Sequence, residues 1–187
     1  MDDESQRLQR MIRPFLIGSF IVELLLAAAW LRLVRQSSLL ELLRAPGWEI
    51  SLALGIPLGI AISLATRLYF SQFATGLIRE MFVPLFGRVS NTDVALLAIM
   101  PALGEEILFR GVVQPEIGLI AASLLFGLLH SGFSRQLLPY GVWSTAVGLL
   151  LGGLYLATGS LWGSIAAHAL VNALDALWVR KLASRVS

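Results

Sequence analysis

Three charged side chains stand together inside a hydrophobic stretch, in the sequence GEEILFRG that ends at Gly111. Glu106 and Arg110 are four residues apart, so on a helix they lie on one face and can form an ion pair. Glu105 is turned about 100° from Glu106 by the helical period, so it cannot share that arginine equally. An ionisable group in a membrane helix costs about 2.5–3.5 kcal/mol and usually marks function. The cluster indicates a functional site, with a polar network that only holds helices together as the alternative.

The chain contains only two histidines, and both lie in predicted hydrophobic helices. His130 follows Phe126 by four residues, and Asn172 follows His168 by four, so each pair shares one helical face. A carboxylate and a histidine together can activate a water molecule as a general base. A second histidine and an asparagine can donate hydrogen bonds to a developing oxyanion. This set of residues fits hydrolysis of an amide or an ester bond inside the membrane.

The same residue types could also bind a metal ion, because histidine and carboxylate side chains are ordinary zinc ligands. The chain has no cysteine and lacks the H-E-x-x-H sequence of the common zinc proteases. The sequence GLLHSGFS does not match the G-x-S-x-G sequence of serine hydrolases. We therefore expect no cofactor, with a divalent metal such as zinc as the open alternative.

The composition indicates an integral membrane protein. Of the 187 residues, 57% are hydrophobic and 14% are charged, whereas soluble domains have about 45–50% and about 25%. The mean hydropathy is +0.78 and the isoelectric point is about 9.5. The basic residues lie at the ends of apolar runs, which is typical of topology signals at the membrane surface. No basic stripe with interleaved aromatic residues occurs, so we expect the lipid bilayer and no nucleic acid as a partner.

The residues of the cluster must be positioned by an all-α bundle of about six membrane-spanning helices, forming one domain over residues 1–187. The predicted spans cover residues 14–34, 48–70, 92–113, 117–131, 142–157 and 161–179. Residues 71–91 form a mixed stretch that is predicted to add a short helix at the membrane interface. Because six spans return the chain to its starting side, and arginines gather near both termini, we predict both termini in the cytoplasm of a bacterial inner membrane.

The predicted helices place Glu105 and His130 at different depths in the membrane. At about 1.5 Å per residue, Glu105 would lie about 20 Å into the third span. His130 ends a helix that runs in the opposite direction. For the two side chains to meet, the third span must either begin later than residue 92 or break, and the stretch from Pro101 to Gly104 is the predicted place of a break.

Two further acidic residues lie in the predicted spans. Glu23, in the first span, is predicted to snorkel or to pair at a helix interface rather than to act chemically. Asp175, in the last span, is predicted to lie near the membrane surface with Arg180.

Three short sequences resemble the motifs of one family of membrane proteins. EEILFR, from Glu105 to Arg110, is similar to the EExxxR motif of the CPBP family of CAAX proteases and bacteriocin-processing proteins. FGLLH, which ends at His130, is similar to the FxxxH motif, and HALVN, from His168 to Asn172, is similar to the HxxxN motif. The three sequences occur in the order of the family, on three separate predicted helices.

The resemblance covers residues 92–179 and implies an intramembrane endopeptidase acting on a membrane-associated peptide or protein. The roles that it implies are activation of water by Glu105 and His130, an oxyanion hole from His168 and Asn172, and support of the site by Glu106 and Arg110. A glutamate-type mechanism is favoured over a metalloprotease, because the oxyanion hole needs no metal. The alternatives are a non-proteolytic scaffold or bacteriocin immunity protein, and a proton-coupled transporter.

Overall fold

The computed structural model of the protein describes residues 3–186, with side chains from residue 11 to residue 185. This part of the chain is helical and contains no strand, which confirms the predicted all-α class. The helices are α1 (Asp3–Leu33), α2 (Leu39–Leu43), α3 (Trp48–Phe73), α4 (Thr75–Leu77), α5 (Val83–Phe86), α6 (Asn91–Leu108), α7 (Gln114–Ile117), α8 (Leu119–Ser131), α9 (Leu138–Thr158) and α10 (Leu161–Val186). Two π-helical turns interrupt them, η1 (Ile78–Phe82) and η2 (Phe109–Val113).

Helices occupy the six stretches that were predicted to span a membrane. Three of them, α1 from Met11 onward, α3 and α9, are long and apolar enough to cross one by length and composition. α8 is apolar but shorter, and α6 and α10 carry the polar residues of the predicted site. Large apolar side chains such as Phe15, Leu68 and Ile120 are exposed on the outside of the bundle. A soluble protein rarely exposes so much apolar surface, so these faces contact lipid and the chain is a membrane protein.

The stretch from residue 71 to residue 91, predicted as a short interfacial helix, forms α4, η1 and α5. The predicted break from Pro101 to Gly104 is wrong, because α6 continues through both residues to Leu108. The irregular turn lies one step further on, where η2 begins at Phe109.

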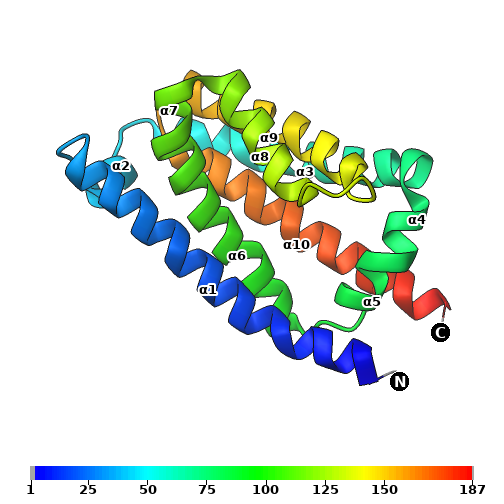
Figure 1. Ribbon diagram of the computed structural model, residues 1–187. Coiled ribbons are helices and arrows are strands. Elements are labelled where there is room, and N and C mark those ends of the chain that lie inside the picture. The colour runs from blue at the N-terminus through cyan, green and yellow to red at the C-terminus, as the bar shows by residue number, and fades with distance from the viewer. Residues whose placement is uncertain (1–2, 187) are drawn as a thin grey trace.

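α6 and α10 lie at the centre of the bundle (Figure 1). α10 packs against α3, α6 and α9, α6 packs against α1, and α8 pairs with α9. The two ends of the chain lie at the same end of the bundle (Figure 1). This arrangement agrees with an even number of crossings, and the cytoplasmic placement of that end stays a prediction.

Small residues bring α3 and α10 into close contact. A Cβ atom at Gly55 would collide with the backbone of Gly163, and one at Gly59 would collide with the backbone of Ala167. Small residues spaced four apart allow this approach between membrane helices. The contact holds α10, which carries His168, at a fixed distance from α3.

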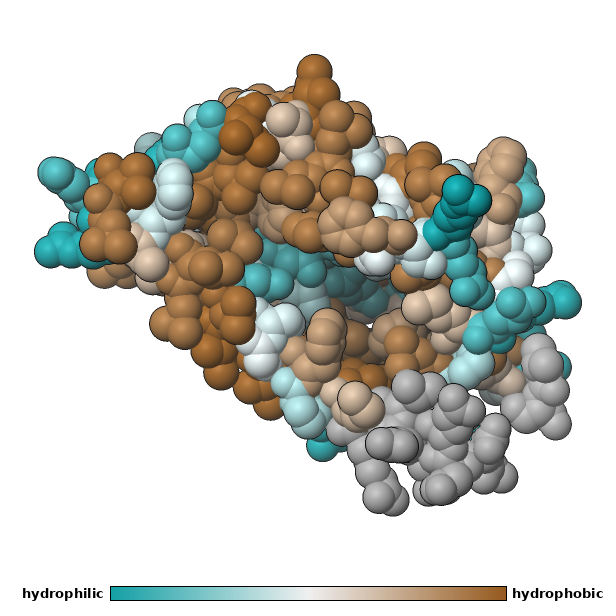
Figure 2. All heavy atoms as spheres, in the orientation of Figure 1, coloured by the Kyte–Doolittle hydropathy of each residue, from teal (hydrophilic) through white to brown (hydrophobic). Residues whose placement is uncertain are grey.

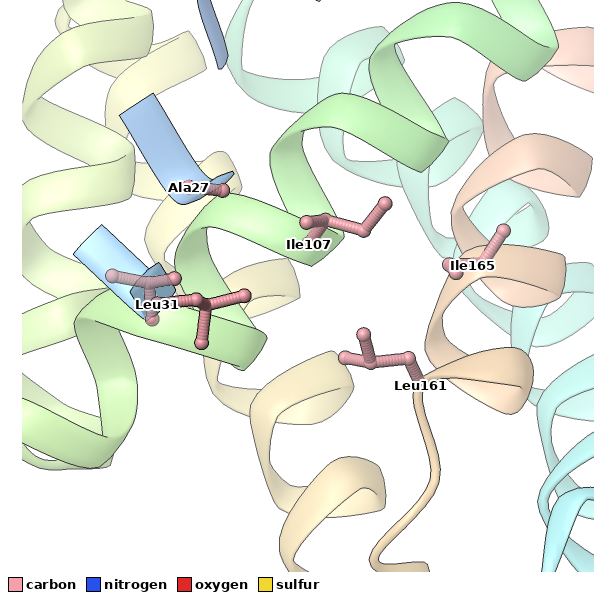
Figure 3. Packing of buried hydrophobic residues seen from close by; sticks show 6 residues of the cluster. Ala27, Leu31, Ile107, Leu161 and Ile165 are labelled. Atoms are coloured by element: carbon pink, nitrogen blue, oxygen red, sulfur yellow. The ribbon is translucent and has the colours of Figure 1, made fainter. Parts of the chain in front are cut away.

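A hydrophobic cluster joins α1, α6 and α10 next to the predicted site. Its buried members are Ala27, Leu31, Ile107, Val112, Leu161 and Ile165. Figure 3 shows Ala27 and Leu31 of α1 beside Ile107 of α6, with Leu161 and Ile165 of α10 facing them. Because Ile107 directly follows Glu106 in the sequence, this packing anchors the turn that carries the two glutamates.

Polar contacts tie both ends of α1 to the segment from α6 to α7. At one end, Arg13 pairs with Asp93 over 2.6 Å, and Asp93 forms a capping box with Ser90 at the start of α6. At the other end, Glu116 accepts hydrogen bonds from Trp30 at 3.2 Å and from Arg35 at 2.9 Å. Both bonds hold the pKa of Glu116 below its usual value. α1 and α6 therefore run parallel in a defined register.

Candidate active site

Five of the six residues predicted from the sequence lie together between α6, α8 and α10. They are Glu105, Glu106, Arg110, His130 and His168. The sixth, Asn172, lies one turn from His168 on α10, where its Nδ2 donates to the backbone carbonyl of Leu97 at 3.3 Å. The cluster has a sealed half and an accessible half, and one of the two adjacent glutamates belongs to each.

The sealed half is an ion pair between Glu106 and Arg110. Arg110 Nε lies 3.1 Å from Glu106 Oε2, and both side chains are 0% exposed. The N–H groups are not aimed at that oxygen, so the contact is an ion pair without a well-aligned hydrogen bond. The guanidinium also lies 5.2 Å from the centre of the Phe126 ring, a favourable cation–π position. The i,i+4 pairing predicted from the sequence is confirmed.

Arg110 lies in the π-helical turn that follows the two glutamates. At the end of α6 the N–H of Phe109 is shared between the carbonyls of Glu105 and Glu106, and η2 then begins. π-Helical turns within α-helices are frequent at functional sites because they change the direction of the side chains that follow. The irregular backbone thus coincides with the residue that neutralises Glu106.

His168 is oriented by Glu106. Its Nδ1 lies 2.9 Å from Glu106 Oε1, and because an ionised carboxylate only accepts, this ring nitrogen carries the proton and donates. The opposite ring atom, Nε2, lies 3.9 Å from Glu105 Oε2. Glu106 therefore fixes the orientation of the His168 ring, so that Nε2 faces Glu105.

His130 is oriented in the same sense by its own helix. Its Nδ1 lies 2.8 Å from the carbonyl oxygen of Phe126, so this nitrogen must be the donor. Its ring packs against Phe126, with centroids 4.2 Å apart, and against Tyr140 at 5.5 Å. Its Nε2 lies 3.7 Å from Glu105 Oε2. The Nε2 atoms of two histidines on different helices thus converge on one carboxylate oxygen.

Glu105 and His130 meet because of the length of the connection between α6 and α8, and α6 needs no break. From Glu105 the chain continues for about 12 residues to Ile117, and α8 returns for about 12 residues from Leu119 to His130. The outward and return paths have nearly equal length. Glu105 and His130 therefore reach the same depth although α6 is continuous at Pro101.

The two adjacent glutamates differ in access. The side chains of Glu105 and His130 are 18% and 21% exposed, whereas Glu106 is sealed. Figure 2 shows a hollow on one face of the molecule, with hydrophilic residues at its floor and a mixture of hydrophobic and more polar residues around it. Glu105 Oε2 has no hydrogen-bond partner in the described part of the chain.

The residues that could contribute to a metal site are Glu105, His130 and His168. Zinc ligands lie about 2.0–2.2 Å from the ion. Within residues 3–186, no group of three or more histidine, cysteine or carboxylate side chains is arranged to hold a metal ion. The hydrogen bonds to both Nδ1 atoms would suit metal-bound imidazoles as well as free ones.

The structure corrects two predictions about acidic residues. Asp175 lies against α3, where it accepts a hydrogen bond from Ser63 at 2.6 Å. Arg180 instead donates to Asn91 at 2.9 Å, so the predicted pairing of Asp175 with Arg180 is wrong. Glu23 was predicted to snorkel or to pair, but its Oε2 is buried and no residue of the described chain forms a hydrogen bond with it.

Sequence reasoning did not list two aromatic residues that border the cluster. Phe126 contacts Arg110 and His130, and Tyr140 contacts His130. Phe126 had a signal, because it precedes His130 by one helical turn. Tyr140 belongs to α9, and nothing in the local sequence connects that helix with His130.

The fold and the cluster define a helical membrane protein with a carboxylate and two imidazoles gathered between three helices. The chain belongs to the type II CAAX prenyl endopeptidase Rce1-like family, whose sequence model matches residues 89–174. The uncharacterized protein YpbD of Bacillus subtilis is 32% identical over 128 residues, 67% of each chain. UPF0177 protein YxdF of Lactococcus lactis is 40% identical over 50 residues, 24% of this chain and 28% of that protein. No solved structure matches the chain. At the level of the family, the chain is grouped with membrane proteases of the CAAX-processing type.

Proposed function

We propose that the protein is an intramembrane endopeptidase that hydrolyses a peptide bond of a membrane-associated protein or peptide. The observation that carries the proposal is the convergence of the Nε2 atoms of His130 and His168 on Oε2 of Glu105, whose side chain is partly exposed. Family membership supports the reaction class, and the arrangement of these three side chains supports the mechanism.

Glu105 and His130 are suited to activate the attacking water. Their separation of 3.7 Å exceeds a direct hydrogen bond but suits one water molecule in contact with both. In the proposed step the water oxygen attacks the carbonyl carbon of the scissile bond while Glu105 accepts a proton. His130 orients the water through the lone pair on Nε2. The proton then passes to the nitrogen of the leaving amine as the carbon–nitrogen bond breaks.

His168 is suited to stabilise the oxyanion of the tetrahedral intermediate. Because its Nδ1 already donates to Glu106, its Nε2 can donate only when the ring carries two protons. The buried carboxylate of Glu106 stabilises this imidazolium through a charge-assisted hydrogen bond. Asn172 uses one N–H on the carbonyl of Leu97, which leaves its second N–H for the same oxyanion.

The substrate class follows from the location of the site and from the family. The outside of the bundle exposes large apolar side chains, so a substrate held in the bilayer by a lipid chain or an apolar segment would meet the protein within the membrane. The relatives in this family include type II CAAX prenyl endopeptidases. We place the activity in a bacterial inner membrane with both termini in the cytoplasm.

The test uses the full chain in lipid nanodiscs and an internally quenched CAAX peptide in two forms, farnesylated and joined to an apolar membrane anchor. In ¹⁸O-labelled water, cleavage should place ¹⁸O in the new carboxylate. Loss of the general base in Glu105→Ala or His130→Ala should lower the rate about 10²- to 10⁴-fold. Ser63→Ala, on the far side of α10, is the matched control. If both site variants cleave like the wild type, the protease assignment is wrong.

The same preparation separates a glutamate-type mechanism from a metalloprotease. We expect cleavage to continue after chelation and dialysis, because the proposed steps use only side chains of this chain. Activity that disappears with chelator and returns with zinc would favour the metal alternative. A wild-type protein that cleaves neither peptide would favour a scaffold, an immunity protein or a transporter.

A further inference from the structure

A third glutamate reaches the site from α1, which lies outside the matched residues 89–174. The carboxyl group of Glu23 lies on the bare Cα of Gly104, and a Cβ atom there would collide with Glu23 Oε2. Gly104 directly precedes Glu105. The glycine thus opens the space through which the α1 side chain approaches the site.

The register of α1 against α6 holds Glu23 at this level. Arg13 pairs with Asp93 at the start of α6, and from there Glu23 lies about ten residues along α1 while Gly104 lies about eleven along α6. Because the helices run in the same direction, both residues rise by nearly the same distance. The position of Glu23 follows from contacts at the end of α1.

The surroundings of Glu23 favour its neutral form. Its Oε2 is buried and has no hydrogen-bond partner among the described residues, and an anionic oxygen in such a place is strongly disfavoured. Glu105 follows Gly104 directly in the sequence, so a second carboxylate lies nearby, and a like charge disfavours the anionic form of Glu23. With Glu23 neutral, two carboxylates balance one guanidinium and one imidazolium.

We propose, building on the hydrolysis proposed above, that Glu23 is a positioning residue that holds a proton beside Glu105 and keeps the cluster electrically neutral. Ionisation of Glu23 adds a third negative charge to the site. That charge opposes the oxyanion, which is itself negative in the transition state. Glu23 therefore acts through its neighbours and does not touch the reacting atoms.

The other charged groups around α1 already have partners or lie elsewhere. Those on the elements packed against it are Glu41 of α2, Asp93, Glu105 and Glu106 of α6, and Arg110 of η2. Glu41 caps α2 through Ser38, and Asp93 pairs with Arg13. Ionisation of Glu23 would therefore act electrostatically mainly on Glu105 and on the imidazolium of His168.

Infrared spectroscopy tests the stored proton without reference to peptidase activity. The wild type at neutral pH should show the carbonyl stretch of a protonated carboxylic acid, and Glu23→Gln should lose it. Glu49→Gln, which replaces an exposed glutamate at the start of α3, is the matched control and should retain the band. If Glu23→Gln and Glu49→Gln give the same spectrum, Glu23 holds no proton and the proposal is overturned. This result stands whether or not the protein cleaves a peptide.

The pH profile of cleavage tests the effect on the site. The wild-type rate should fall as rising pH ionises Glu23, whereas in Glu23→Gln it should fall only when His168 loses its second proton. The limb that depends on Glu23 should therefore be absent from the profile of Glu23→Gln. An alkaline limb that stays at the wild-type position overturns the proposal, even with Glu105 shown to be essential.

A paired substitution tests the placement of Glu23 on Gly104. Gly104→Ala should destabilise the protein, because the added methyl group displaces the carboxyl of Glu23. Glu23→Ala in the same chain removes the colliding Oε2 but leaves the tight contact with Phe20, so it should restore part of the unfolding temperature. If Glu23→Ala restores none of it, the carboxyl does not lie on Gly104 and the proposal fails.

Discussion

α10 carries buried polar side chains on two faces, and the two faces differ in how their hydrogen bonds are satisfied. Toward α3, Ser63 donates to Asp175 at 2.6 Å, and Ser51 donates to the carbonyl of Ser160 at 3.0 Å. These groups hold two closely packed helices together. Toward α6, the buried Oε2 of Glu105 and the N–H groups of Arg110 have no hydrogen-bond partner among the described residues.

The polar groups between α3 and α10 form a structural network that holds the two helices together. Hydrogen bonds between membrane helices contribute about 0.6 kcal/mol each on average. Ser51 and Ser63 each donate to an acceptor there, whereas Ser160 Oγ and Arg67 Nε have no hydrogen-bond partner among the described residues. The α6 face combines ionisable groups with unmet hydrogen bonds, which costs free energy unless another molecule completes them. The difference supports a structural role for one face and a chemical role for the other.

The sharpest way to break this comparison is to remove one partner of the sealed ion pair. Arg110→Met leaves the carboxylate of Glu106 buried without its neutralising charge, and we expect it to lower the free energy of unfolding by about 3–5 kcal/mol. Denaturant titration in detergent micelles measures the change. The double variant Glu106→Leu/Arg110→Met removes both charges and should be less destabilised than Arg110→Met. A double variant that is worse than the single one would show that the pair is not the source of the loss.

A second prediction compares the two faces by rate. His168→Ala removes the proposed oxyanion donor, so we expect cleavage to slow about 10²- to 10³-fold, or about 2.7–4 kcal/mol in activation free energy. The single-turnover rate on the anchored peptide measures it. Asp175→Asn, two turns along α10, is the control and should keep the rate. Equal losses in the two variants would contradict the division between the faces.

The sequence predicted the parts of the site that depend on helical spacing. The pairing of Glu106 with Arg110 follows from a separation of one turn, and the structure places the pair as expected. The orientation of His130 depends on Phe126, again one turn away. Local periodicity is sufficient for such contacts because both partners lie on one helix.

The contacts that could not be predicted join residues far apart in the chain. Asp175 pairs with Ser63 because glycines bring α3 against α10, and Glu23 lies on Gly104 because contacts at the ends of α1 set its register. Helical spacing contains no information about which faces of two helices meet. The meeting of Glu105 and His130 depends on the length of the connection through η2 and α7, which the helical spacing within α6 and α8 does not contain.

The third prediction sharpens the structural side of the comparison. Asp175→Ala leaves the hydroxyl of Ser63 buried without its acceptor, and we expect a loss of about 1–3 kcal/mol in the free energy of unfolding. The cleavage rate per folded molecule should stay at the wild-type value, because Asp175 faces α3. Thermal unfolding and the peptide assay on the same preparation measure both quantities. A lower rate with unchanged stability would mean that Asp175 belongs to the chemistry.

The smallest expected effect concerns Asn172, which has both a structural contact and a proposed role at the oxyanion. Pro101 has no N–H, so the carbonyl of Leu97 lacks its usual helical partner, and Asn172 Nδ2 donates to it. Asn172→Ala should therefore lower the free energy of unfolding by about 0.5–1.5 kcal/mol. In a Pro101→Ala background the N–H of residue 101 can take over that carbonyl, so the stability effect of Asn172→Ala should shrink. Any loss of cleavage rate that persists in the double variant measures the part of Asn172 that acts on the oxyanion, and no persisting loss would assign the residue to the structural side.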